Sequence, residues 1–431
     1  MSRSAGECAE ACRRGLRRWS GVLLLGVAGV AWADASRSAL VSSSCLEAVL
    51  RELGWVIQTQ GEQIRINGGI PCRRASLAQA QAAGDLRLVL PARSDAVRRQ
   101  QALIEALNAP ASRCAYAFAV GTAARRAAIR LQTNPGYRFS AIQLGWIGFG
   151  LRGAQAQGWQ RFRSFGRGYR PLGSNAAALQ AFYSGKVRSD CGVGRQVAQL
   201  ATLRELFGDA AFDHAFTASE LSIGTFLTLH DTDSVLLGRH AGSLFADGKA
   251  VRSAQLGRQA FMGVPGFIEH AFDATFVDDI NNQAENFVVV DVSAEAADAL
   301  AAHGGLRYYD AINKRIWALA RQMPQYSYQR FERLLYQRDA ALWARLPPAQ
   351  QALVAQMQAL LDDPFYRGFR VYVHPQGIRP IGYHIARLLD RNPRTPYAIE
   401  LTLHNVYTTL YQRWIDSRLD TCAEAAIGTD H

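Results

Sequence analysis

The sequence predicts an α+β fold, in which helices and strands form separate runs along the chain. Residues 191–207 place apolar side chains at helical spacing and end at Gly208, which indicates a helix. Short apolar segments with the composition of strands follow it: FLTLH (226–230), SVLLG (234–238), FVVVDV (287–292) and LRYYD (306–310). A helix followed by several strands therefore favours an α+β core.

The first 33 residues have the pattern of an export signal. An arginine-rich segment precedes the uncharged residues 21–30, and Ala31-Trp32-Ala33 supplies a small–x–small cleavage pattern. An uncleaved anchor over residues 19–33 is the alternative, although a bilayer needs about 20 apolar residues. No later stretch is long and apolar enough to span. We therefore expect a periplasmic or secreted protein without a stable membrane span after signal cleavage.

The charge balance is basic but scattered. The 431 residues carry a formal charge of +12, which falls to +9 without residues 1–33. The densest basic group lies among glycines and aromatics between Arg152 and Arg170. Charge alone is compatible with nucleic acid, but export favours a solvated basic face or anionic cell-envelope polymers. We expect no nucleic-acid partner.

We divide the chain after the signal into three regions. Residues 34–140 form an N-terminal α/β module, with helix patterns at 43–53, 94–107 and 113–131 and strand patterns at 55–60, 62–67 and 86–91. Residues 141–310 form the core, which begins with a glycine-rich stretch (141–175) that predicts loops. Residues 311–431 form a mostly helical C-terminal region, with helices expected over 328–346, 347–363 and 396–419 and a strand-like FRVYVHP between them.

Five cysteines follow the signal, an odd number for an oxidising compartment. Cys45 and Cys72 bracket a compact stretch and form a natural local disulfide. Cys114 and Cys422 are then expected to tie the N-terminal region to the C-terminal tail. This pairing leaves Cys191 outside the disulfides; other connectivities of the four remain open.

Cys191 has the setting of a nucleophile as well as that of a buried apolar residue. It follows Asp190 and begins the helix predicted over 191–207. Exposed N–H groups and the positive end of the helix dipole favour a thiolate at such a position. Gly192 and Gly194 leave room for a substrate backbone. A cysteine nucleophile also needs a base, and the base needs a group that orients it.

Among the downstream histidines, His303 is the favoured base. It precedes Gly304-Gly305 and the strand expected at LRYYD. Glu285 opens the strand pattern ENFVVVDV, so both side chains are expected on adjacent strands facing one cleft. His270 and His240 lie in expected loops and remain alternatives, whereas His384 and His404 lie on helical patterns and are expected to be packed or surface residues.

A family resemblance rests on these residues. The motif ENFVVV…AAHGG, with PGFIEHAFD before it and a cysteine-bearing helix upstream, resembles the small bacterial spore-coat protein-glutamine gamma-glutamyltransferases. The SDCG around Cys191 is similar to the DCSG of NlpC/P60 peptidases. The resemblance covers about residues 175–310 and implies a papain-like, NlpC/P60-type core. It assigns Cys191 as nucleophile, Glu285 as acidic partner and His303 as base.

The resemblance implies a cysteine-dependent acyl transferase of the transglutaminase kind. The thiolate attacks a glutamine carboxamide and the acyl group passes to an amine, which cross-links proteins, or to water. The expected partners are proteins or peptides with glutamine and amine donors, including cell-envelope peptides. A cell-envelope cysteine peptidase or amidase and a non-catalytic envelope binding protein are the alternatives. No cofactor and no metal is expected, since His230-Asp231-Thr232-Asp233 lacks a second ligand pair at a recognisable spacing.

Overall fold

The computed structural model describes most of the chain after residue 41. The described residues are 42–60, 63–68, 86–91, 96–139, 158–164, 166–224, 229, 232–237, 253, 257–270, 285–389, 397–401 and 406–427. The expected signal peptide (1–33), the FLTLH segment except for one residue, the His230–Asp231 pair, Cys72, His240 and His404 lie outside them.

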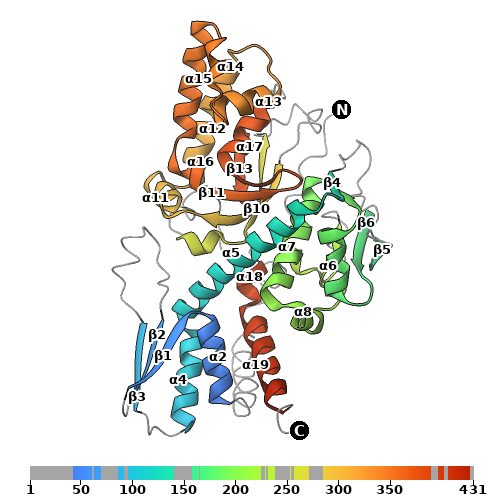
Figure 1. The fold of residues 1–431 in the computed structure, drawn as a ribbon, viewed down its shortest axis with the longest axis vertical. Helices are drawn as coiled ribbons and strands as arrows, with labels where there is room; N and C mark the ends of the chain where they lie inside the picture. The colour runs from blue at the N-terminus through green and yellow to red at the C-terminus, as the bar shows by residue number, and fades with distance from the viewer. Residues whose placement is uncertain are drawn as a thin grey trace, which may run out of the picture.

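Helices make up most of the described chain (Figure 1). Their bounds are α2 Ser43–Glu52, α4 Ala96–Asn108, α5 Pro110–Thr133, α6 Asn175–Ser184, α7 Cys191–Phe207, α8 Asp209–Ala215, α11 Ala294–Ala302, α12 Leu306–Ala320, α13 Tyr328–Phe331, α14 Ala340–Ala344, α15 Pro348–Leu361, α16 Pro364–Gly368, α17 Ile381–Leu388, α18 Val406–Thr409 and α19 Tyr411–Ile427. Shorter helical turns are η2 Val235–Leu237, η3 Arg258–Phe261 and η5 Glu332–Tyr336.

The strands form one five-stranded sheet and three smaller ones. Their bounds are β1 Trp55–Gln60, β2 Gln63–Gly68, β3 Leu86–Pro91, β4 Tyr137–Phe139, β5 Trp159–Ser164, β6 Gly166–Pro171, β7 Val187–Ser189, β8 Ile223–Gly224, β9 Pro265–His270, β10 Glu285–Val292, β11 Phe369–Val373, β12 Gly377–Pro380 and β13 Tyr397–Leu401. The large sheet is antiparallel, with strand order β12-β11-β10-β9-β13. The other sheets are β1-β2-β3, β4-β7 and β5-β6-β8.

The five-stranded sheet separates two hydrophobic cores. Side chains alternate between the two faces of a strand, and in β10 Val288 and Val290 pack with α5 and α7, whereas Phe287 and Val289 pack with α11, α12, α16 and α17. Figure 1 shows the same arrangement, with α5 and α7 on one side of β10 and β11 and helices α12 to α17 on the other. From Phe287 to Val290, successive residues of β10 therefore face alternate cores; the irregularity between Val289 and Asp291 then shifts the pattern, so that Val292 lies in the second core.

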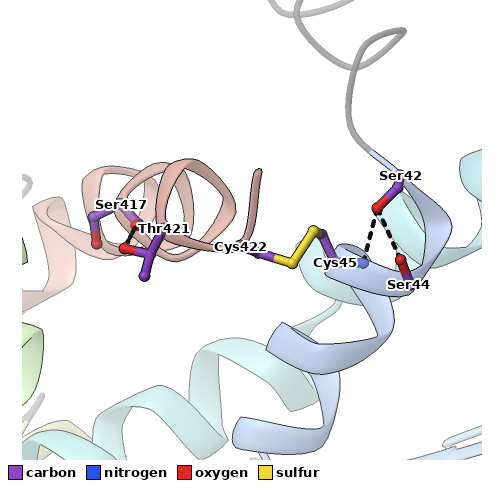
Figure 2. Close-up of a disulfide and its surroundings, with 6 residues drawn as sticks. All are labelled: Ser42, Ser44, Cys45, Ser417, Thr421 and Cys422. Atoms are coloured by element: carbon purple, nitrogen blue, oxygen red, sulfur yellow. Dashed lines mark hydrogen bonds between the residues drawn. A yellow bond between two sulfur atoms is a disulfide. The ribbon is translucent and has the colours of Figure 1, made fainter. Parts of the chain in front are cut away.

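A disulfide links the two ends of the described chain. Cys45 of α2 is bonded to Cys422 of α19, across 377 residues of sequence (Figure 2). The expected partners of these two cysteines, Cys72 and Cys114, were therefore wrong. Cys114 is itself disulfide-bonded. Cys191 carries a thiol, as predicted.

Most helices fell where the apolar spacing placed them, but several segments differ. LRYYD begins α12 rather than forming a strand, because Leu306, Tyr309 and Ile316 lie at helical spacing and all three pack into the second core. The segment after Pro396 begins as strand β13, Val235–Leu237 of SVLLG form a 3-10 turn, and the glycine-rich stretch includes the antiparallel pair β5–β6. The α+β class is confirmed. The five-stranded sheet contains strands from both sides of residue 310, where we expected the core to end: β9 and β10 come before it, and β11, β12 and β13 come after it.

Candidate functional site

Helix α7 begins at Cys191, as the sequence predicted. Asp190 is its N-cap, and the carboxylate oxygen Oδ1 accepts a hydrogen bond from the Val193 N–H at 2.7 Å. Asp is among the preferred N-cap residues because its short side chain reaches the orphan N–H groups of the first turn. The cap fixes the Cys191 side chain at the first turn, where the helix faces the start of β10.

The Cys191 thiol is half-buried and contacts β10. Its Sγ accepts a hydrogen bond from the Asn286 side-chain amide, with Nδ2 3.4 Å from the sulfur. Burial raises the pKa of Cys191, the charges of Asp190 and Glu285 raise it further, and the bonds from Asn286 oppose the rise. The thiol is thus protonated at neutral pH. Burial here opposes the thiolate that the helix dipole favours.

Two charged groups of α7 lie beside the thiol. Burial raises the pKa of Asp190 to about 7, against the hydrogen bonds from the Val193 and Gly192 backbone. Its second oxygen, Oδ2, is buried and has no hydrogen-bond partner within the described part of the chain, and the same holds for Nε of Arg195. Burial also lowers the pKa of Arg195, which interacts electrostatically with Cys191 and Asp190. The surroundings of Cys191 thus hold a titrating acid and a cation.

His374, which comes directly after β11, packs against α7. A Cβ placed on Gly194 would lie 2.5 Å from Cβ of His374, 3.0 Å from its Cγ and 3.2 Å from its Cδ2. The Cδ2 side of the ring therefore faces α7. Gly194 is one helical turn after Cys191, and residues at this spacing share a helix face.

The His374 ring is held in place by its neighbours. It stacks on Tyr137 with ring centroids 3.9 Å apart, and the Tyr137 hydroxyl shares a 2.8 Å hydrogen bond with Ser189, two residues before Cys191. A hydrogen bond to the Arg138 backbone favours the protonated ring, whereas burial dominates and lowers the pKa of His374 to about 4. Since Nε2 is buried without a partner among the described residues, the bond to Arg138 is made by Nδ1. The ring is neutral at pH 7.

Asn286 and His374 occupy the same end of neighbouring strands. The β10–β11 pairing includes Val288 opposite Tyr372, and both residues belong to the core that contains α7. One same-face step further along each strand are Asn286 and His374. The sheet thus brings an amide and an imidazole to the face on which Cys191 lies.

Glu285 faces the other side of the sheet. Its carboxylate binds His384 through Nδ1 and Arg387 through Nε, the latter at 2.7 Å, and both partners belong to α17. These two groups lower the pKa of Glu285 although burial opposes them. The acidic partner predicted from sequence does bind an imidazole, but that imidazole is His384 and not His303.

His303 lies apart from this arrangement. It is the exposed C-cap of α11 and stacks on Tyr308, with ring centroids 4.2 Å apart. The segment after it is helix α12, so the strand expected at His303, beside the strand of Glu285, is a helix instead. Of the alternatives, His270 ends β9 opposite Tyr397, and His240 is outside the described residues.

Sequence reasoning missed His374, Asn286 and His384. The signal for His374 was the strand pattern FRVYVHP, which ends in a histidine. The signal for Asn286 was the period of ENFVVV, in which neighbouring residues face opposite sides of a strand. His384 was expected to be a packed or a surface residue, and the structure shows that its side chain is fully buried.

In the part of the chain described, no helix is both long and apolar enough to cross a membrane. The same residues include no group of three or more His, Cys, Asp or Glu side chains placed to hold a metal ion. Compared with known protein families, curated proteins and solved structures, the chain matches none of them.

Proposed function

We propose that this protein is a thiol-dependent acyl-transfer enzyme in which Cys191 is the nucleophile and His374 the general base. The observation that carries the proposal is the placement of three groups on one face at one end of the sheet. The Cys191 thiol begins α7, and its sulfur accepts a hydrogen bond from the Asn286 amide. The Cδ2 side of His374, whose Nε2 is buried, packs against Gly194 one turn along the same helix. Nucleophile, base and amide donor are the groups that acyl transfer requires.

The chemistry follows from the protonation states. Thiol and imidazole are both neutral at rest, because burial raises the pKa of Cys191 and lowers that of His374. Proton transfer from Sγ to Nε2 then accompanies attack on the substrate carbonyl carbon, as in general-base catalysis. Asn286 and the backbone N–H of Cys191 face the developing oxyanion, since the next N–H groups of α7 bond to Asp190. The protonated imidazole next returns the proton to the leaving amine, and a thioester remains on Cys191.

The substrate that we propose is a glutamine carboxamide of a protein or peptide. Ammonia leaves in the first step, and the thioester passes to an amine, which forms an isopeptide bond, or to water, which leaves glutamate. Peptides of the cell envelope fit the export expected from residues 1–33. A peptidase or amidase would use the same groups on a backbone amide, with water as the acceptor.

The test uses a glutamine-containing peptide with a fluorescent primary amine. The measured quantities are ammonia release and covalent incorporation of the amine. Cys191→Ala is expected to abolish both, and His374→Ala to slow them by about 10²- to 10⁴-fold, the range for a lost general base. His303→Ala is the matched control, because its ring is exposed and stacks only on neighbouring aromatics, and it should retain wild-type rates.

Three outcomes separate the readings. Amine incorporation favours the transferase, and cleavage of backbone amides without incorporation favours the hydrolase. Loss of activity in His303→Ala, with activity kept in His374→Ala, would return the base to the residue that sequence predicted. Full activity in Cys191→Ala would refute the proposal as a whole.

A further inference from the structure

The start of β10 has an unusual anchorage. Asn286 must be placed accurately to contact Cys191, yet the ladder between β10 and β11 begins only at Val288. On the other side, Glu285 and Asn286 pair with β9. The strand end that carries Asn286 is therefore held by the backbone ladder on one side only.

A buried ion cluster supplies the second anchor. Glu285 is 7% exposed and His384 is fully buried. Each carboxylate oxygen of Glu285 has its own partner: Oε2 binds His384 and Oε1 binds Arg387. Both partners lie on α17, which packs in the core on the far side of the sheet. The cluster thus ties the first residue of β10 to a helix on the side of the sheet opposite to Cys191.

The cluster also acts on the thiol through its charge. Glu285 and Asn286 are neighbours, so the carboxylate lies close behind the amide that contacts the sulfur. The negative charge of Glu285 disfavours a thiolate at Cys191, and Arg387 offsets that charge. The other ionisable groups that face Cys191 are Asp190 and Arg195 of α7, and the imidazole of His374 lies at the end of β11.

We infer that Glu285, His384 and Arg387 form a positioning cluster that sets the reactivity of Cys191 from the opposite face of the sheet. Glu285 is then a positioning residue rather than the acidic partner of the base. It holds Asn286 against the sulfur, and its balance with Arg387 sets how readily the thiol ionises. This inference rests on the proposed function only in treating Cys191 as the nucleophile.

The test measures the alkylation of Cys191 by iodoacetamide in the full chain, which needs no turnover. The second-order rate constant is recorded against pH, and peptide mass spectrometry locates the label. Arg387→Met leaves the charge of Glu285 without its offset and should slow alkylation at fixed pH by about three- to tenfold. Glu285→Gln removes that charge and should accelerate it by a similar factor.

Opposite shifts in the two variants are the signature of the cluster, because simple loosening of the fold would move both rates in the same direction. The double variant Glu285→Gln/Arg387→Met should return close to the wild-type profile. Arg379→Met is the control, since Arg379 is the exposed residue of β12, lies over the ring of Tyr383 and makes no contact with Glu285 in the described structure. Thermal unfolding of each variant shows whether the fold is intact.

Equal shifts in both variants, unchanged profiles, or no label at Cys191 would each overturn the inference. These outcomes are independent of whether the enzyme activity is found. Opposite shifts without any acyl transfer would support the positioning cluster and refute the proposed function. Acyl transfer without opposite shifts would support the proposed function and refute the positioning cluster.

Discussion

Gly194 is where α7 and His374 pack closely, and Gly194→Ala tests this contact. A new Cβ would lie 2.5 Å from Cβ of His374, whereas ordinary contacts lie at 3.4–4 Å. Both atoms are fixed to backbone, so relief requires α7 and the end of β11 to move apart. Overpacking of this kind costs about 1–3 kcal/mol, against about 0.5–1 kcal/mol gained when alanine replaces glycine in a helix.

The expected net effect is a loss of about 1–2 kcal/mol in the free energy of unfolding, measured by urea denaturation. The same variant should also slow acyl transfer, because the imidazole is displaced from Cys191. A second substitution checks the cause: His374→Gly removes the clashing atom, so the two substitutions together should destabilise by less than the sum of their separate effects. If Gly194→Ala instead stabilises the protein and keeps wild-type activity, His374 does not pack against α7 as described.

Three further predictions concern stability. Cys45→Ser should lower the free energy of unfolding by about 2–4 kcal/mol through loss of the disulfide to Cys422, and reductant should then have less effect on the melting temperature of the variant. Burial raises the pKa of Asp190 to about 7, so the stability linked to this group is complete below its unfolded pKa and is lost as pH rises through about 7. Asp190→Asn keeps the helix cap and should flatten that loss in denaturation curves taken across this range. Burial lowers the pKa of His374 to about 4. The stability linked to this group is therefore present above about pH 6.5 and is lost as pH falls through about 4. His374→Gln should reduce this acid sensitivity, and an unchanged midpoint of acid unfolding would contradict the buried neutral ring.

Local signals in the sequence were enough for the individual elements. Asp190 before Cys191 and Gly208 after Phe207 mark both ends of α7, and the predicted range 191–207 is the helix observed. The eight residues of β10 begin at Glu285 as predicted. LRYYD was misjudged because its aromatic composition suits a strand, while its helical spacing becomes visible only over the longer window to Ile316.

The site depended on pairings that no local signal records. His374 reaches α7 because β11 pairs with β10, and these strands lie far apart in the sequence. Glu285 turns away from Cys191 because one residue of register in a strand exchanges its two faces. The sequence indicated the proposed nucleophile and the strand beside it, whereas the histidine proposed as its base follows from the register of the sheet.

The position of His374 after β11 also sets the order in which the site is assembled during synthesis. Cys191 and its helix leave the ribosome long before β11 does. Until the chain has grown past residue 374, Cys191 has no imidazole beside it, so the proposed nucleophile and its proposed base are not yet both present. The arrangement on which the proposed function rests is therefore completed only when β11 joins the large sheet.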